Sequence, residues 1–172
     1  PNVLVNCYKD KNYFNIVKSA SFNVCDAISV ELINNITKKR KIKSYPGPDL
    51  FRKISKNHEI KQFFIGGEST EMMSSLIKNI DNCNLKDHHF YCPPFLSAND
   101  FDYLEISKKI NALNPHVIWV GLGAPKQEIF MSKLLPKINK GLLIGVGAAF
   151  SFYSAYKNNK RAPNLFRKLK IE

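Results

Sequence analysis

The sequence predicts an α/β fold, a single Rossmann-like domain with a mostly parallel sheet and helices on both faces. Short apolar runs alternate with amphipathic stretches at helical spacing. The apolar runs are nearly unbroken, which is typical of strands buried on both faces of a parallel sheet. The 172 residues are 44% hydrophobic, and no Pro/Gly/Ser-rich linker divides them. We therefore expect residues 1–172 to form one domain of ordinary size.

The predicted elements alternate along the chain. The predicted strands are Val3–Val5, Phe22–Val24, Gln62–Ile65, His89–Tyr91, Val117–Val120 and Leu142–Val146. The predicted helices are Asn12–Lys18, Ile28–Thr37, Asp49–Asn57, Glu71–Asn79, Asp100–Leu113 and Lys126–Leu134. Two helices are supported by their apolar spacing, with Met72, Leu76 and Ile80 every four residues in one and Ile106 and Ile110 in the other.

The charge of the chain is strongly positive, with 26 Lys and Arg against 14 Asp and Glu, a net charge of +12. Such a field attracts phosphates, nucleic acids and anionic membrane surfaces. Basic residues cluster at 38–43 and again at 157–170, where a solvated surface is the alternative explanation. A second alternative explanation for the positive charge is base composition, because the chain is rich in Asn, Ile and Lys, as is typical of AT-rich coding sequence. Because no nucleic-acid motif is present, we expect no nucleic-acid partner.

Cysteine usage and hydropathy indicate the compartment. The four cysteines show neither CxxC nor zinc-finger spacing, so we expect reduced thiols in a cytoplasmic protein. The sequence holds no apolar run near 18 residues, so we expect no membrane span within it. Contact with a membrane surface stays open.

Three strand ends are rich in glycine, and ligands of parallel α/β sheets bind beyond such ends. The glycines concerned are Gly66, Gly67, Gly121, Gly123, Gly145 and Gly147. Each pair is also compatible with a tight turn. Neither GxGxxG nor a Walker A sequence is present, which counts against nicotinamide dehydrogenases and P-loop NTPases. Pro125 opens a helix without a capping side chain at Ala124, so we expect the amides of residues 126–128 to be available to a phosphate or a sugar hydroxyl.

Two acidic segments are candidates for chemistry. Asp26 follows the apolar run Phe22–Val24, where a carboxylate serves either as a general base or as the N-cap of the next helix, and spacing alone favours the cap. Asp100 and Asp102 match the DxD pattern with which many glycosyltransferases hold a metal. Because Asn99 and Asp100 open a predicted helix, we expect capping and compensation of the helix dipole rather than metal binding. We predict no metal site.

These segments together resemble a known family. Gly121–Glu128, read as GLGAPKQE, resembles the GLGxPKQE signature of the WecG/TagA/CpsF glycosyltransferases, family 26. Supporting segments follow in the family's order: GPDLF at 47–51, FIGGE at 64–68, YCPPF at 91–95, GVGAAF at 145–150 and KRAP at 160–163. The resemblance runs over essentially the whole chain.

The resemblance implies an activity. Members move an N-acetylhexosamine-type sugar, such as N-acetylmannosamine, its uronic acid or a related hexose, from a UDP donor with inversion. The acceptor is a polyprenyl-diphosphate-linked sugar, and the products serve teichoic acid or other cell-surface polysaccharide synthesis. The resemblance further implies a peripheral protein on the cytoplasmic face of an anionic membrane, acting without metal or cofactor. A homo-oligomer stays open.

The resemblance also implies residue roles. Asp26 falls where the family has the proposed base that deprotonates the acceptor hydroxyl. The substrate-binding residues it implies are Asn6, Gly47, Asp49, Gly66, Gly67, Gly121, Gly123, Pro125, Gln127, Glu128, Gly145, Gly147 and Arg161. Among them, Gln127 and Glu128 are expected to contact the sugar or ribose. The turns that contain Gly121 and Gly123, and Gly145 and Gly147, are expected to lie under the diphosphate. Arg161 is expected to offset the charge of the leaving UDP.

The sequence departs from the family pattern at several positions. Leu4, Ala27 and Ser151 stand where members have threonine, glycine and aspartate. By comparison with the family pattern, we expect residues 1–172 to exclude the family's opening strand and helix and its basic membrane appendage. Leu4, Ala27 and Ser151 keep a second function in view, a binding module that retains the nucleotide-sugar fold without catalysis. A nucleic-acid binder driven by net charge is the third.

Overall fold

The computed structural model describes residues 2–38, 41–80 and 89–154. Its strands are β1 (Gln62–Gly66), β2 (Phe90–Tyr91), β3 (Val117–Gly121) and β4 (Leu142–Gly145). Its helices are α1 (Asn2–Lys9), α2 (Lys11–Lys18), α3 (Ile28–Thr37), α4 (Gly47–Ser55), α5 (Thr70–Ile80), α6 (Tyr103–Leu113), α7 (Lys126–Leu134), the 3₁₀ turn η2 (Leu135–Lys137) and α8 (Ala149–Tyr153). The six predicted helices and four of the six predicted strands are present within a few residues of their expected bounds.

The four strands form one parallel sheet in the order β2-β1-β3-β4. The central pair is in register from Gln62 opposite Val117 to Gly66 opposite Gly121. All five residues of β1 are buried, which explains why its sequence is an unbroken run rather than an alternating one. The predicted parallel α/β sheet is confirmed.

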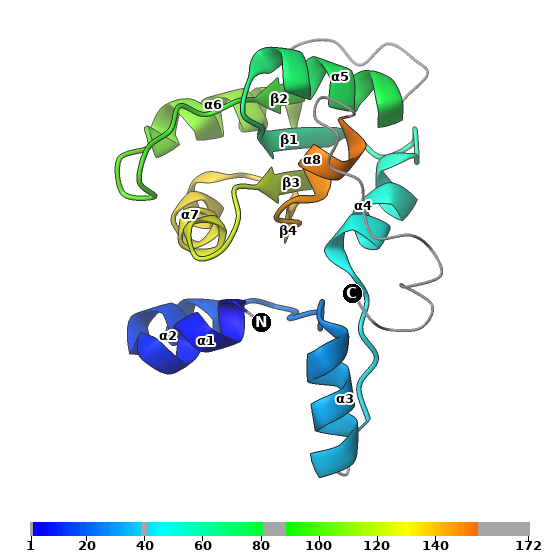
Figure 1. Cartoon of the computed structure of the whole chain (residues 1–172). Coiled ribbons are helices and arrows are strands. Elements are labelled where there is room, and N and C mark those ends of the chain that lie inside the picture. The colour runs from blue at the N-terminus through cyan, green and yellow to red at the C-terminus, as the bar shows by residue number, and fades with distance from the viewer. Residues whose placement is uncertain (1, 39–40, 81–88, 155–172) are drawn as a thin grey trace.

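Helices cover both faces of this sheet (Figure 1). On one face Phe64 and Trp119 pack with apolar side chains of α4, α5 and α8. On the other face Phe63, Ile118 and Val120 pack with those of α6 and α7. Because neighbouring residues of a strand point to opposite faces, the two cores are built from alternate positions of the same strands. Parallel strands end on the same edge, which gathers the glycine-rich turns.

The predicted strand at Val3–Val5 is wrong, because these residues lie in α1. A three-residue apolar run does not by itself distinguish a strand from a helix. In the structure the half-buried side chains are those of Val3, Asn6 and Cys7, which recur at helical spacing, whereas Leu4 and Val5 are exposed. Asn6, which directly follows that predicted strand, therefore lies in α1 rather than at a strand end.

The predicted strand at Phe22–Val24 is also wrong. These residues are irregular, with Phe22 86% exposed and Val24 57% exposed. The sheet of the described residues ends at β4 and does not include them. A strand without a neighbour forms no ladder of hydrogen bonds, so the apolar run alone does not make one.

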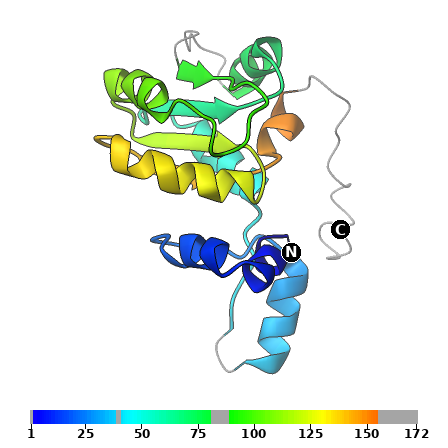
Figure 2. The same ribbon diagram turned by 90° about the vertical axis from the view of Figure 1, so that its left-hand side faces the viewer.

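The three N-terminal helices lie to one side of the sheet, below it in both Figure 1 and Figure 2, and α3 extends away from it. The chain returns from α3 along a segment that is bonded to the helix. Glu31 accepts hydrogen bonds from the amide and the hydroxyl of Ser44. The Asn35 side chain both donates to and accepts from the backbone of Ile42. These bonds bring the residues before α3 close to those after the return, at the start of α4.

Candidate functional site

The Asp26 carboxylate is bound to the start of α4. Its Oδ1 accepts a hydrogen bond from the Gly47 N–H at 2.7 Å. The N-cap of α3 is Ala27, and no side chain caps that helix. The interpretation of Asp26 as a helix cap is therefore wrong, because its carboxylate is bonded to Gly47, outside α3.

Gly47 also brings Asp26 to the end of β4. A Cβ placed on Gly47 would lie 3.7 Å from Asp26 Oδ1 and 3.7 Å from Val146 Cα. Val146 is the middle residue of the predicted Gly145–Gly147 turn, and its N–H donates to the Val120 carbonyl of β3 at 2.9 Å. The carboxylate therefore lies beside the turn at the carboxyl end of the sheet, and Asp26 itself is exposed to solvent.

Gln127, in the first turn of α7, packs onto the same turn. Its Oε1 accepts a hydrogen bond from the Gly147 N–H at 2.9 Å. A Cβ on Gly145 would lie 2.3 Å from Gln127 Nε2, so a side chain at position 145 would require the Gln127 amide to move. The Gln127 side chain is 7% exposed and its amide is engaged inside the protein. The expected contact between Gln127 and the donor stays a prediction.

Glu128 has a partner that the sequence did not indicate. Its Oε2 accepts a hydrogen bond from the Tyr13 hydroxyl of α2 at 2.9 Å, and its Oε1 accepts one from Gln127 Nε2 at 3.2 Å. Tyr13 is 3% exposed. Burial, followed by the hydrogen bond to Glu128, raises the pKa of the Tyr13 phenol well above its usual value. In sequence, Tyr13 was only one apolar position of an amphipathic helix, and no local signal links it to residue 128.

The glycines at the strand ends divide into two kinds. Gly66, at φ +140°, would leave only 2.7 Å between an added Cβ and the Gly121 carbonyl oxygen, and a Cβ on Gly121 would meet the Phe150 ring at 2.7 Å. These two permit close packing inside the protein. By contrast, nothing lies within 4 Å of a Cβ on Gly123 or Gly147, both of which have positive φ. The open side of the two turns is where the backbone is accessible to a ligand.

The start of α7 differs partly from expectation. Pro125 precedes the helix as its N-cap, joined to Ala124 by a cis peptide bond, and no side chain caps the helix. Of the amides at 126–128, that of Gln127 already donates to the Gly123 carbonyl at 2.8 Å. The expectation that all three amides are available is therefore wrong, because the turn closes on itself through Gln127.

Three other predicted site residues, Asn6, Asp49 and Gly67, have different surroundings. Asn6 lies in α1, where its carbonyl accepts the Asp10 N–H at 2.9 Å. Asp49 lies half-buried in the first turn of α4, two residues after Gly47, where a carboxylate suits the helix dipole. Gly67 packs against the sulfur of Met73. Arg161 lies outside the described residues.

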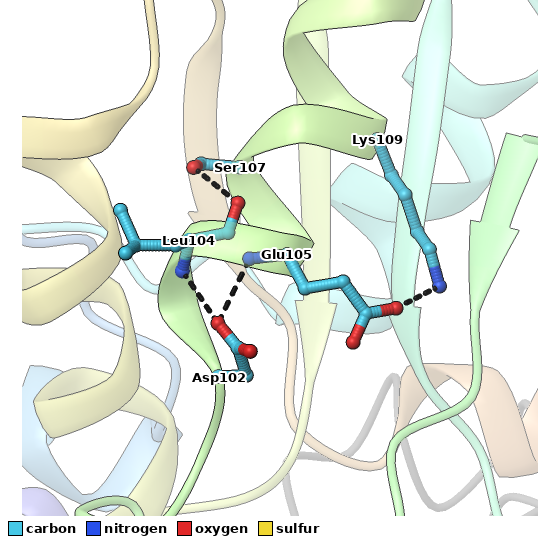
Figure 3. Close-up of polar contacts among 5 residues, drawn as sticks. All are labelled: Asp102, Leu104, Glu105, Ser107 and Lys109. Atoms are coloured by element: carbon cyan, nitrogen blue, oxygen red, sulfur yellow. Dashed lines mark hydrogen bonds and ion pairs between the residues drawn. The ribbon is translucent and has the colours of Figure 1, made fainter.

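The DxD segment caps a helix, but the capping residue is Asp102 rather than the expected Asn99 or Asp100. Asp102 Oδ1 accepts hydrogen bonds from the amides of Leu104 at 3.0 Å and Glu105 at 2.9 Å (Figure 3). Glu105 in turn pairs with Lys109, one turn along α6, at 2.7 Å. The helix begins at Tyr103 rather than at Asp100, so Asp102 is the capping residue.

A metal site and a membrane span are two further kinds of feature that residues 2–38, 41–80 and 89–154 could contain. Within these ranges no three His, Cys, Asp or Glu side chains form a group that could hold a metal ion. None of the helices in these ranges has the length and apolar character that a bilayer span requires. A hollow of about 410 Å³ lies over α5, lined by Thr70, Glu71, Ser74, Ser75 and Lys78. It contains none of the predicted site residues.

The chain is similar in sequence to several bacterial enzymes. The N-acetylglucosaminyldiphosphoundecaprenol N-acetyl-beta-D-mannosaminyltransferase of Bacillus subtilis (strain 168) is 27% identical over 176 residues, covering 100% of this chain and 66% of the relative. The enzyme of the same name from Staphylococcus aureus (strain NCTC 8325 / PS 47) is 28% identical over 168 residues, covering 93% and 62%. That from S. aureus (strain MRSA252) is 29% identical over 169 residues, covering 93% and 62%. The chain thus spans about two thirds of the length of these relatives.

A family profile accounts for the chain from end to end. The profile described as the glycosyl transferase WecG/TagA/CpsF family matches residues 1–172. The match includes the GLGAPKQE turn, whose Gln127 and Glu128 bind the end of β4 and α2. By this match, the chain belongs to the WecG/TagA/CpsF glycosyltransferase family.

Proposed function

We propose that this protein transfers an N-acetylmannosamine-type sugar, or its uronic acid or a related hexose, from a UDP donor to a lipid-diphosphate-linked sugar. The names of the relatives support the sugar and the acceptor class. The observation that carries the proposal is the exposed Asp26 carboxylate beside the Gly145–Gly147 turn. A base and an anion-binding turn on one edge of the sheet are the two parts that such a transfer requires.

Asp26 is the base in this proposal. Its Oδ1 is engaged by the Gly47 N–H, and its Oδ2 takes the proton of the acceptor hydroxyl. As that proton leaves, the acceptor oxygen forms a bond to the anomeric carbon of the donor sugar from the face opposite the diphosphate. The bond between that carbon and the diphosphate oxygen breaks, and UDP departs with the electron pair. The result is inversion at the anomeric carbon.

The donor is bound by the accessible backbone of the turns at Gly123 and Gly147, where no protein atom lies within 4 Å of the position that a Cβ would take. Charge on the departing diphosphate is offset by backbone dipoles and by Arg161. Metal is not assigned a role, because Asp102 of the DxD segment is engaged as the cap of α6. We assign the protein to the cytoplasmic face of the membrane, where a lipid-linked acceptor is found and where the net charge of +12 favours an anionic surface.

The test is a transfer assay with a panel of UDP-N-acetylhexosamines and their uronic acids against a polyprenyl-diphosphate-linked N-acetylglucosamine. We expect one donor to be preferred and UDP to be released in equal amount to the glycosylated lipid, with a product of opposite anomeric configuration. Retention of configuration would contradict the single-displacement mechanism. Addition of a chelator should leave the rate unchanged.

A nucleotide-sugar-binding module without catalysis is the second candidate, favoured by Leu4, Ala27 and Ser151 at three positions of the family pattern. Calorimetry with UDP-sugars separates it from the first. Binding of a UDP-sugar without any product, across the whole donor panel, would favour the module.

A steep loss of affinity for arbitrary DNA or RNA with rising salt concentration is expected only of the third candidate, a nucleic-acid binder.

A further inference from the structure

Three side chains connect α2 to the turn at the end of β4. The Tyr13 hydroxyl donates to Glu128 Oε2 at 2.9 Å. Glu128 Oε1 accepts from Gln127 Nε2 at 3.2 Å, and Gln127 Oε1 accepts from the Gly147 N–H at 2.9 Å. Each carboxylate and amide oxygen in this series is thus matched with one donor. The series joins the N-terminal helices to the carboxyl end of the sheet.

The burial of the series distinguishes it from a surface contact. Tyr13 is 3% exposed and Gln127 7% exposed, whereas Glu128 is half-buried. A hydrogen bond to a charged group that is shielded from water is stronger than one between neutral groups. The carboxylate can accept but not donate, so it sets the orientation of the Gln127 amide, with Nε2 toward Glu128 and Oε1 toward Gly147. That orientation holds the Gly147 N–H inward and directs the open side of the turn outward.

We propose that Tyr13 is a positioning residue for the donor-binding turn, acting on Gly147 through Glu128 and Gln127. This inference deepens the proposed function, since it assigns the preorganisation of that same site to a residue of α2. Tyr13 does not touch the donor. It keeps Glu128 in the position that orients Gln127, so the turn is in its binding conformation before the donor arrives.

The variant that isolates the hydroxyl is Tyr13→Phe, which keeps the buried ring and removes one donor. We expect the KM for the UDP-sugar to rise about three- to thirtyfold, while kcat changes by less than about twofold, because the turn must be ordered on binding instead of beforehand. The matched control is Tyr8→Phe, since Tyr8 in α1 is 93% exposed. This control should keep the KM of the unaltered protein.

The Gly147 amide signal reports on these hydrogen bonds without any substrate. In a ¹⁵N–¹H correlation spectrum, the Gly147 amide signal should shift in Tyr13→Phe and stay in place in Tyr8→Phe. Glu128→Gln should shift the same signal, and the double variant should shift it no further than the larger single change, because both substitutions interrupt one series. This measurement uses the protein alone, so it stands even if no UDP-sugar is turned over and the proposed function fails.

Two outcomes overturn the proposal. One is an unchanged Gly147 signal in Tyr13→Phe, and the other is a shifted signal with unchanged KM in a protein that does transfer sugar. If Tyr13→Phe lowers the melting temperature so far that the fold is lost, the Glu128→Gln spectrum decides in its place. A residue with a merely structural role would lower the melting temperature without raising KM at temperatures where the protein is folded.

Discussion

The Asp26 carboxylate and the Gly47 N–H form a 2.7 Å hydrogen bond across 21 positions of sequence. Between these two residues the chain runs away from the sheet along α3 and then returns to α4 (Figure 1). The bond joins the two ends of this segment. Two further side chains of α3 hold the returning segment: Glu31 accepts a hydrogen bond from the Ser44 amide, and Asn35 accepts one from the Ile42 amide. A carboxylate that follows an irregular segment is thereby placed against the ordered start of α4.

Substitution of this carboxylate tests the catalytic assignment. Asp26→Asn keeps the size of the side chain and an oxygen that can accept the Gly47 N–H, but it removes the proposed base. We expect transfer to fall at least about tenfold, within the range typical of general bases, with UDP binding unchanged. Asp10→Asn is the control, because Asp10 also accepts backbone N–H groups, at the start of α2, but has no assigned role in the reaction. Full turnover in Asp26→Asn would remove Asp26 from the mechanism.

The cap of α6 gives a prediction on stability. Asp102→Ala removes the acceptor of the Leu104 and Glu105 amides and should lower the free energy of unfolding by about 1 kcal/mol. Asp100→Ala, at an exposed position two residues earlier, should change it by less than about 0.5 kcal/mol. Urea denaturation measures both. If the pair instead held a catalytic metal, both variants would lose transfer activity while remaining stable.

Two glycines of positive φ should respond differently to alanine. At Gly66 a Cβ would lie 2.7 Å from the Gly121 carbonyl oxygen, so Gly66→Ala must separate β1 from β3 and should cost about 3 kcal/mol or more. At Gly123 nothing lies within 4 Å, so Gly123→Ala should cost only the backbone strain of about 1–2 kcal/mol. Thermal unfolding of the two variants compares these costs. Equal losses would indicate that packing at the strand end is not the reason for Gly66.

The buried tyrosines predict a loss of stability in alkali. Burial raises the pKa of Tyr103, whose hydroxyl donates to the Ala98 carbonyl, to about 12. In the unfolded chain a tyrosine has a pKa of about 10, so above that pH the unfolded state binds fewer protons than the folded state. The contribution of Tyr103 is therefore complete below a pH of about 10 and is lost progressively toward a pH of about 12.

The measurement is the free energy of unfolding from about pH 9 to about pH 12, with Tyr103→Phe as the test variant. This variant should show a shallower decline with pH than the unaltered protein, because it lacks one of the groups that ionise on unfolding. Tyr45→Phe, at an exposed position, should keep the original slope. A slope unchanged in Tyr103→Phe would contradict the assignment of the decline to this phenol.

Much of the sheet was predictable from local pattern. The runs at Gln62–Ile65, Val117–Val120 and Leu142–Val146 were long and apolar enough to be recognised as buried parallel strands, and the structure pairs them in one sheet. The runs at Val3–Val5 and Phe22–Val24 were shorter, and the second contains Asn23. Val3–Val5 lies in α1, and Phe22–Val24 is irregular and is not paired with a strand of the described sheet.

The sequence indicated members of a candidate site but not the contacts that these residues make. The glycine turns and Asp26 were indicated by their positions after apolar runs and by the family pattern. The sequence did not indicate three contacts. The Gln127 side chain accepts the Gly147 N–H, the Gln127 N–H donates to the Gly123 carbonyl, and the Tyr13 hydroxyl donates to Glu128. Each of these depends on a partner that a short window of sequence does not contain.

The amino-acid order alone determined the parallel sheet, its two-sided core and the positions of the glycines, because periodicity and residue type act over a few neighbouring residues. Only the tertiary structure decided that Asp26 bonds to Gly47 rather than capping α3, and that Tyr13 reaches Glu128. A carboxylate or a hydroxyl bonds whichever donor or acceptor the fold brings within about 3 Å. That neighbour is set by the packing of distant segments.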